Sequence, residues 1–268
     1  MLHLIKEPIE PKYSFVVTAS RERCLDNVFK QIENLQFPNP ELTELVFYFD
    51  CKAHQFDNYL IGKLEQIKRF NGIKLFISGS HAWKDSDPVI CRRQRVIEIW
   101  EKLKSIMGDT EVVFGMEDDM TLPVNAFMKL HNHLALDEKI GFASGYTIGR
   151  WKKPIVGAWD ITYDEKGKAV QVQSLMPGKG LQYMQGGGLY CFATFTKMLK
   201  THTFTDQAPC LSVDVSFVES VVKSGYKAVV DWSIPCDHNL EDGRVLKPKK
   251  TEIVQTIWIK KDDEWEEN

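Results

Sequence analysis

The sequence predicts an α/β fold in which a mainly parallel central sheet carries helices on both faces, with a smaller and less regular region beside it. Between residues 13 and 146, short apolar runs alternate with segments whose apolar residues recur at helical spacing. Strands that alternate with helices form doubly wound parallel sheets, which bind ligands beyond the carboxyl ends of their strands. A length of 268 residues is enough for one large α/β domain or two small ones.

Five apolar runs predict the strands of this sheet, at residues 13–20, 45–50, 71–79, 111–116 and 140–146. The helices predicted between them, from apolar residues recurring every three or four positions, cover residues 25–35, 56–70, 88–106 and 123–134. Asp87 followed by Pro88 predicts the N-cap and first position of the third helix, and Pro123 begins the fourth.

The regular alternation loosens after Arg150, where Trp, Gly and Pro occur at irregular intervals. The elements predicted in this part are a hairpin around 165–167, helices over 186–200 and 212–225, a strand over 227–235 and a frayed, charged tail over 260–268. Ser212 is the predicted N-cap of the second of these helices, and Gly225 its C-terminal stop.

The composition is that of an ordinary soluble globule, with 43% hydrophobic and 26% charged residues. A net charge of −3 disfavours an electrostatic nucleic-acid binder, although it allows a nucleic acid bound through a local patch. The six cysteines are scattered without a C-x-x-C pair, which indicates reduced thiols. The N-terminus lacks the apolar run of a signal peptide, and no stretch of about 20 apolar residues predicts a membrane span. We therefore expect a soluble, cytoplasmic protein.

One apolar strand runs directly into three consecutive carboxylates, Glu117, Asp118 and Asp119. Two like charges about 5 Å apart repel by roughly 3 kcal/mol at an effective dielectric of about 20, so this acid cluster needs a positive partner. Carboxylates at the end of a central strand suit Mg²⁺ or Mn²⁺, which bind few protein ligands and share the rest with phosphate and water. The alternative is a surface cluster favoured by the dipole of the helix that begins at Pro123.

Several segments, taken in chain order, resemble the GT-A glycosyltransferases, in particular the large inverting group related to family 2. They are FVVTASRERCLDNVFKQIENL (15–35), LVFYFD (45–50), CRRQRVIEIW (91–100), VVFGMEDDMTLPVNAF (112–127), GGGLYCF (186–192) and VDVSFVESVVKSGYKAVV (213–230). They are similar to the nucleotide loop, the base-binding strand, the Arg-Asn helix, the DXD strand, the glycine-rich acceptor segment and the catalytic helix of that group. The usual Glu-Asp pair of the catalytic helix reads Val213-Asp214 here, and the Arg-Asn pair falls within residues 92–95.

The resemblance implies a single GT-A domain over residues 1–268, with a nucleotide-sugar-binding half (12–148), an acceptor-binding and catalytic half (149–240) and a C-terminal tail (241–268). The implied nucleotide-sugar contacts are Thr18, Ala19, Ser20, Arg21, Asp50, Arg95, Glu117 and Asp118. Mn²⁺ or Mg²⁺ is implied at Asp119 and His238. Gly186, Gly187 and Trp232 are the implied acceptor or sugar contacts, and Asp214 is the implied catalytic base.

These roles make chemical sense together. An acceptor hydroxyl becomes a good nucleophile when a base removes its proton, a contribution of about 10²–10⁴-fold. A divalent ion disperses the charge that builds on a departing nucleotide diphosphate. The resemblance therefore implies a metal-dependent glycosyltransferase that moves a sugar from a nucleotide diphosphate sugar, with UDP favoured, to an acceptor hydroxyl by inversion.

Two other functions stay open from the residues. A nucleotidyltransferase on a similar sheet is disfavoured because the loop TASRERC (18–24) contains no glycine. A non-catalytic sugar- or nucleotide-binding module is disfavoured by the complete acid cluster. The acceptor is open among a glycan, a protein and a modified nucleobase of phage-type DNA.

Further aromatic and histidine residues have less defined roles. The aromatic residues that could stack on a sugar are Trp151, Trp159, Tyr183 and Trp232, although core packing is their commoner role. His131 and His133 lie on a helix predicted to be exposed, and we assign them no role.

Overall fold

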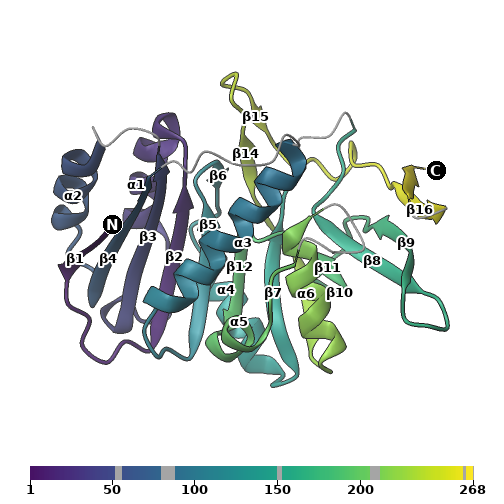
Figure 1. Cartoon of the computed structure of the whole chain (residues 1–268), viewed down its shortest axis with the longest axis horizontal. Coiled ribbons are helices and arrows are strands. Elements are labelled where there is room, and N and C mark those ends of the chain that lie inside the picture. The colour runs from purple at the N-terminus through teal and green to yellow at the C-terminus, as the bar shows by residue number, and fades with distance from the viewer. Residues whose placement is uncertain (52–55, 80–87, 150–152, 206–211, 262–263, 268) are drawn as a thin grey trace.

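The computed structural model describes residues 1–51, 56–79, 88–149, 153–205, 212–261 and 264–267. Its central sheet contains, in spatial order, β1 (Leu2–Lys6), β4 (Gly72–Gly79), β3 (Thr43–Cys51), β2 (Tyr13–Ala19), β5 (Val112–Glu117), β12 (Cys191–Phe195), β7 (Ile140–Tyr146), β13 (Lys227–Pro235) and β10 (Leu181–Met184) (Figure 1). The pairs β2–β3, β2–β5, β3–β4 and β7–β13 are parallel. The other four neighbouring pairs, β1–β4, β5–β12, β7–β12 and β10–β13, are antiparallel. The predicted α/β fold with a large central sheet is therefore confirmed, its parallel part is β4–β3–β2–β5 with β7–β13, and the five strands predicted in the first half all form.

Residues 186–200 differ from the prediction, which made them a helix. Gly186–Gly187 forms strand β11, Cys191–Phe195 forms β12, and the helix α5 covers Thr196–Thr201. β12 lies antiparallel between β5 and β7 and pairs with both, so its apolar side chains are buried on both faces of the sheet. A short apolar run fits a buried strand as well as a helix, and here pairing on both edges decides for the strand.

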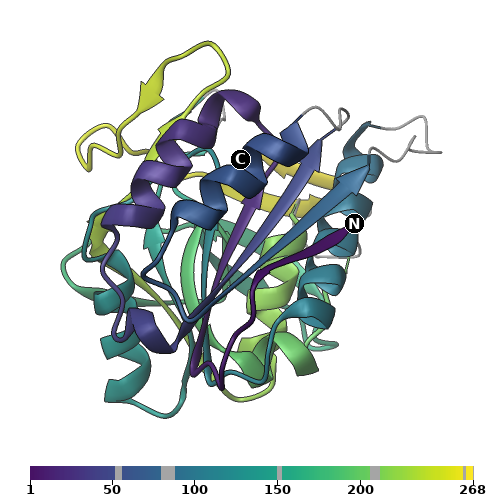
Figure 2. The ribbon, with the colours of Figure 1, turned by 90° about the vertical axis from the view of Figure 1, so that its left-hand side faces the viewer.

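Helices cover both faces of the central sheet. One core lies between the sheet and α1 (Leu25–Asn34), α2 (Asp57–Gln66) and α4 (Ala126–Leu136). The other lies between the sheet and α3 (Pro88–Ile106), α5 and α6 (Val213–Lys223), and Figure 2 shows α1 and α3 on opposite sides. Short 3-10 helices, η1 (Glu22–Cys24) and η2 (Pro40–Leu42), precede α1 and β3. Within the described residues, no helix is both long and apolar enough to cross a membrane.

The ends of helix α6 agree with the prediction. Ser212 occupies the N-cap position, and Gly225 follows the helix with a φ of +92°, a conformation that glycine adopts without a Cβ clash. The N–H of Gly225 donates to the Val222 carbonyl over 2.9 Å. Helix α3 begins at Pro88, and its predicted cap, Asp87, lies outside the described residues.

Two smaller sheets stand beside the central one. The first contains, in spatial order, β11, β8 (Ala158–Tyr163), β9 (Ala169–Ser174), β16 (Ile257–Lys261) and β17 (Glu264–Glu267). The second contains β15 (Val245–Leu246), β14 (Asp237–Asn239) and β6 (Met120–Thr121). The predicted hairpin around 165–167 is the β8–β9 connection, where Gly167 has a φ of +74°.

The prediction of a frayed tail is wrong for the residues that form β16 and β17. β16 pairs antiparallel with both β9 and β17. The Trp258 side chain is buried, and its ring lies edge-on to the Trp159 ring at 5.2 Å between centroids. The charge pattern of residues 260–268 indicated solvent on all sides, but Trp265 of β17 packs, partly buried, against the cluster that contains Trp159 and Trp258.

Candidate functional site

The acid cluster lies where the carboxyl ends of β2 and β5 meet. Asp118 and Asp119 are almost completely buried, with 1% and 0% of their surfaces exposed. The loop after β2 closes over Asp118, because the backbone N–H groups of Ser20 and Arg21 each donate to Asp118 Oδ2 over 2.7 Å. The Asp118 N–H in turn donates to the Thr18 carbonyl over 3.0 Å. The predicted nucleotide loop and the acid cluster are thus a single hydrogen-bonded unit.

Arg21 supplies the positive charge that the carboxylates need. Its guanidinium donates to Asp118 Oδ1 and lies 3.3 Å from Asp119 Oδ2. The Arg21 side chain keeps 27% exposure, whereas the two carboxylate side chains have 2% and 0%. One cation therefore spans two buried anions at the solvent-facing edge of the cluster, so the partner seen in the structure is a side chain.

His238 reaches the same cluster from β14, which pairs with β6. The His238 Nδ1 atom lies 3.0 Å from the Ile148 carbonyl, which can only accept a hydrogen bond, so Nδ1 carries a proton. The Nε2 atom then faces Asp119 Oδ2 at 3.1 Å. A bare imidazole nitrogen and a carboxylate oxygen repel at this distance, so a second proton or a cation belongs between them.

The residues present fit a divalent ion. A hard carboxylate and an imidazole are ligands that Mn²⁺ accepts, and neighbouring ligands at about 2.1 Å from an octahedral ion lie about 3 Å apart. The Asp119–His238 separation matches that spacing. Among the described residues, no group of three or more His, Cys, Asp and Glu side chains is arranged as a metal centre. A protein site of two ligands would leave the other positions to phosphate and water, as is common for Mg²⁺.

Asp214 lies in the first turn of α6, and a chain of contacts joins it to the acid cluster. The Leu189 N–H lies 3.5 Å from Asp214 Oδ2. The carbonyl of the following residue, Tyr190, accepts the Glu117 N–H over 3.4 Å. Burial raises the pKa of Asp214 to about 6, and the Leu189 N–H opposes this shift. A carboxylate that titrates near neutral pH beside a ligand site is suited to general-base chemistry.

The glycines before Leu189 allow helix α6 to pack closely against strand β11. A Cβ on Gly186 would lie 2.6 Å from Val215 Cγ1 of α6, and one on Gly187 would lie 2.9 Å from Met184 Cε. Both glycines are buried in β11. Their place in the structure is therefore explained by close packing, which brings the N-terminus of α6 and Asp214 against this segment.

Asp50 and Arg95, two of the predicted nucleotide contacts, form an ion pair. Asp50 lies near the carboxyl end of β3 and is 7% exposed, and Arg95 Nε of α3 donates to its Oδ2. β3 pairs with β2 in a register that places Ala19 opposite Phe49, so Asp50 follows directly beside the nucleotide loop. The structure thus brings Thr18, Ala19, Ser20, Arg21, Asp50, Arg95, Glu117, Asp118, Asp119 and His238 to one edge of the sheet.

Trp232, a predicted sugar contact, is buried in the core and is not available to a ligand. Its side chain is 2% exposed, its indole N–H donates to Gln182 Oε1 over 2.9 Å, and its ring packs edge-on against Tyr146. A ring enclosed in this way presents no face to a sugar, so the predicted sugar contact is better explained as core packing. Trp159 is also buried, and Trp151 lies outside the described residues.

The sequence predicted that His131 and His133 lie on an exposed helix. In the structure both side chains of α4 are partly buried instead. His131 lies edge-on to the Tyr13 ring at 5.5 Å, and burial lowers its pKa. His133 Nε2 lies 2.7 Å from Asp231 Oδ2 of β13. Sequence reasoning also missed the backbone groups of Leu189 and Ile148 that orient Asp214 and His238, because every residue carries such groups.

Two solved structures of glycosyltransferases share this fold. GalNAc-T7 with UDP, GalNAc and Mn²⁺ aligns with a TM-score of 0.56 at 12% identity, over 85% of this chain and 43% of that chain. The mannosyltransferase PcManGT from Pyrobaculum calidifontis, in complex with GDP-Man and Mn²⁺, aligns with a TM-score of 0.54 at 11% identity, over 83% of this chain and 56% of that chain. This chain thus spans about half the length of each.

A third chain, A197 from STIV, aligns over 88% of this chain and 94% of that chain at 10% identity, with a TM-score of 0.41 that is too low to define a common fold. No protein-family model and no curated protein sequence matches the chain. The fold itself is GT-A-like, and what the chain does has to be inferred from the residues of its site.

Proposed function

We propose that this protein is a metal-dependent glycosyltransferase that moves a sugar from a nucleotide diphosphate sugar to an acceptor hydroxyl. The observation that carries the proposal is the convergence of Asp119 and His238 beside the nucleotide loop, with Asp214 joined to the same edge through Leu189. A site for binding alone needs no carboxylate that titrates near pH 6.

The residues take the following roles in this proposal. The loop from Thr18 to Arg21 and the Asp50–Arg95 pair bind the nucleotide, with Glu117 and Asp118 at the ribose. Asp119 and His238 hold Mn²⁺ or Mg²⁺, which would stabilise the negative charge of the diphosphate when bound. Gly186 and Gly187, the predicted acceptor contacts, are buried, so in this proposal they act on the acceptor side by letting α6 and Asp214 pack closely. Residues 12–148 would then bind the donor and residues 149–240 the acceptor.

Asp214 acts as the general base in a single displacement, as in the inverting group that the sequence resembles. The acceptor oxygen attacks the anomeric carbon as its proton passes to the Asp214 carboxylate. The bond from the anomeric carbon to the phosphate oxygen breaks, and its electron pair leaves with the nucleotide diphosphate. The sequence offers no second carboxylate that obviously fits a nucleophile, which favours inversion over a covalent intermediate.

The alternatives predict different behaviour. A nucleotidyltransferase would release pyrophosphate from a nucleoside triphosphate, whereas this reaction releases a nucleoside diphosphate. A binding module would hold the donor without releasing either product. UDP sugars with Mn²⁺ are the first donors to assay, and NMR of the product linkage reports whether the anomeric configuration is inverted.

The metal assignment is tested by Asp119→Ala, with Asp109→Ala as its control. Asp109 is also an acidic residue, but its side chain is 99% exposed and pairs with Lys200 on the surface. We expect Asp119→Ala to abolish the Mn²⁺-dependent part of UDP binding in calorimetry while the circular dichroism spectrum stays unchanged. Unchanged Mn²⁺-dependent affinity in this variant would overturn the assignment.

A further inference from the structure

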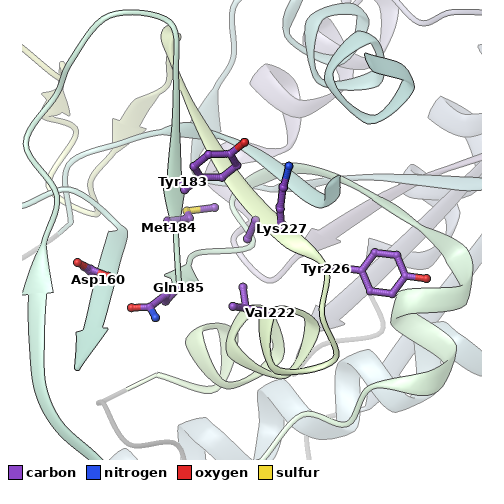
Figure 3. Close-up of a pocket in the computed structure, with 8 residues that line it drawn as sticks. Asp160, Tyr183, Met184, Gln185, Val222, Tyr226 and Lys227 are labelled. Carbon is purple, nitrogen blue, oxygen red and sulfur yellow. The ribbon is translucent and has the colours of Figure 1, made fainter. Parts of the chain in front are cut away.

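A hollow is lined in part by the C-terminal end of α6, the end opposite Asp214. It has a volume of about 330 Å³ and is lined mainly by Asp160, Tyr183, Gln185, Val222, Tyr226 and Lys227 (Figure 3). Val222 follows Asp214 by eight positions on the same helix, a separation of about 12 Å along the axis. Lys227 begins β13, so the hollow lies at the amino end of this strand, opposite the carboxyl-end site. The hollow therefore lies at the other end of α6, while its lining residue Gln185 directly precedes Gly186, which packs against Val215 beside Asp214.

Tyr183 gives the hollow an exposed aromatic ring in a fixed position. It belongs to β10, an edge strand of the central sheet, and is 62% exposed. Lys227 Nζ lies 5.4 Å from the centre of this ring and donates to Asp137 Oδ2 over 2.7 Å. The lysine covers one part of the ring and holds it, and the carboxylate of Asp137 neutralises the lysine charge. Figure 3 shows Tyr183 and Lys227 close together at one side of the hollow.

A second tyrosine is held in the same manner. Tyr226 lies beyond Lys227 in Figure 3 and has Lys197 Nζ 5.2 Å from its ring centre. Two tyrosines from adjoining elements, each with an ammonium group over its ring, thus border the hollow. Rings that are already ordered lose little conformational entropy when a ligand binds to them.

Planar polar groups stand on the side of β8. Gln185 Oε1 accepts the Ile161 N–H over 2.6 Å, which fixes the amide and leaves its NH₂ group as the donor. The Asp160 carboxylate is exposed, and its Oδ1 accepts the same N–H over 3.1 Å. A carboxylate acceptor and an amide donor that are both fixed by backbone contacts can bind adjacent hydroxyl groups of one ligand.

The charges of the hollow and its aromatic and polar side chains indicate which class of ligand it can bind. Phosphates and other anions are disfavoured, because Asp137 neutralises Lys227 and Asp160 adds a negative charge. A purely apolar ligand would bury the polar groups of Asp160 and Gln185 without partners. A sugar ring presents C–H groups that pack on an aromatic face and hydroxyl groups at its rim. The volume lies at the low end of the range of about 300–1,000 Å³ for small-molecule sites.

We propose that this hollow, lined by Tyr183, Gln185 and Asp160, binds a neutral oligosaccharide. The site goes beyond the proposed transfer reaction, since it is lined by Val222 near the opposite end of α6 from Asp214 and needs neither donor nor metal. It would hold a second part of a glycan, or a second glycan, while the carboxyl-end site carries out the chemistry. An oligosaccharide ligand also favours a glycan over a nucleobase as the acceptor, a step that rests on the proposed function.

The test uses the full chain without metal or donor, so its result does not depend on the proposed transferase activity. The probes are cellotriose, chitotriose and mannotriose, and saturation-transfer NMR with calorimetry measures their binding. We expect at least one trisaccharide to bind, and Tyr183→Ala and Asp160→Ala each to weaken that binding at least tenfold.

Tyr59→Ala is the matched control, because Tyr59 is 38% exposed and has Lys63 Nζ 5.7 Å from its ring, but lies on α2. This variant should bind the trisaccharide like the unmodified protein, and adding UDP with Mn²⁺ should not displace the sugar. The proposal is overturned if none of the three sugars binds, if Tyr183→Ala binds normally, if Tyr59→Ala is equally impaired, or if UDP with Mn²⁺ displaces the sugar.

Discussion

Arg21 holds the candidate site together through both its backbone and its side chain. Its N–H group fixes Asp118 Oδ2, and its guanidinium spans Asp118 and Asp119. The same guanidinium lies where a divalent ion bound by Asp119 would need room. Because a cation is required between these buried carboxylates, we expect Arg21 and the metal to compete for them.

Replacement of Arg21 by methionine tests this competition. Arg21→Met keeps the backbone contact but removes the guanidinium, so Mn²⁺ no longer has to displace a bound cation. We expect Mn²⁺ alone to bind more tightly by about 1 kcal/mol, or roughly fivefold, in calorimetry. The variant without metal should melt at a lower temperature and gain more from added Mn²⁺.

The control is Lys12→Met, which removes one positive charge from a surface pair with Glu111. It should change Mn²⁺ affinity little, since exposed pairs contribute about 0–1 kcal/mol and are screened by salt. Equal Mn²⁺ affinity in Arg21→Met and in the unmodified protein would contradict the competition.

Asp214 is the residue whose ionisation should control the rate. Its pKa of about 6 means that the basic form is populated above that pH and lost below it. We expect transfer by the unmodified protein to rise between pH 5 and pH 7 and then level off. Asp214→Asn should bind donor normally but transfer sugar at least about 10²-fold more slowly. Near-normal turnover in this variant would show that Asp214 is not the general base and only stabilises the start of helix α6.

The same pKa predicts that Asp214 destabilises the folded protein at neutral pH. An acid with a raised folded-state pKa holds its proton more tightly when folded, so stability falls as pH rises from about 3.9 to about 6 and stays lower above that window. We therefore expect Asp214→Asn to be more stable than the unmodified protein at pH 8. The advantage should shrink toward pH 4, as measured by urea midpoints. A variant that is less stable at pH 8 would show that the folded protein favours the charged carboxylate.

At the scale of elements, the position of α6 decides whether Asp214 reaches the site. Gly186 gives α6 its close approach, because a Cβ there would lie 2.6 Å from Val215 Cγ1. The contact lies one residue after Asp214, so any displacement of the helix moves the carboxylate away from Leu189. Catalysis is sensitive to misplacement on the scale of 1 Å.

A double-mutant cycle tests this packing. Gly186→Ala should lower the rate of transfer, and Val215→Ala, which removes the clashing methyl group, should restore part of it in the double variant. Gly62 in α2 provides the control, since a Cβ there meets nothing within 4 Å. Gly62→Ala should leave transfer unchanged and raise stability by about 1 kcal/mol through helix propensity. Additive losses in the double variant would show that the clash is not the cause.

At the scale of the whole molecule, the C-terminal strands extend the smaller sheet. β16 pairs with β9, and Trp258 is 7% exposed against Trp159. Strand β16 is therefore an integral part of this sheet. Because β8 of the same sheet pairs with β11, this packing also supports the glycine segment beside Asp214.

Removal of one buried ring tests the contribution of these strands. Trp258→Ala should lower the free energy of unfolding by about 3 kcal/mol, the usual cost of truncating a buried aromatic side chain, as measured by urea unfolding. Val254→Ala is the control, because Val254 is 39% exposed just before β16. A loss below about 1 kcal/mol in Trp258→Ala would indicate that the C-terminal strands add little to the fold.

Local patterns determined much of the fold and the first half of the site. The strands β2, β3, β4, β5 and β7 follow from short apolar runs between helical periods, since burial pattern and turn chemistry act over a few residues. The acid cluster was predictable because Glu117, Asp118 and Asp119 directly follow a buried strand. Their need for a positive partner follows from Coulomb's law, which requires no structure.

The tertiary structure decided which residues contact the acid cluster and which strands pair. It places β12 between β5 and β7, His238 against Asp119 from 119 positions away, and Arg21 across the carboxylates. It also raises the pKa of Asp214 through burial, and it encloses Trp232 in the core. Strand insertion, desolvation and contacts between distant residues depend on how the whole chain packs, so composition and spacing do not contain them.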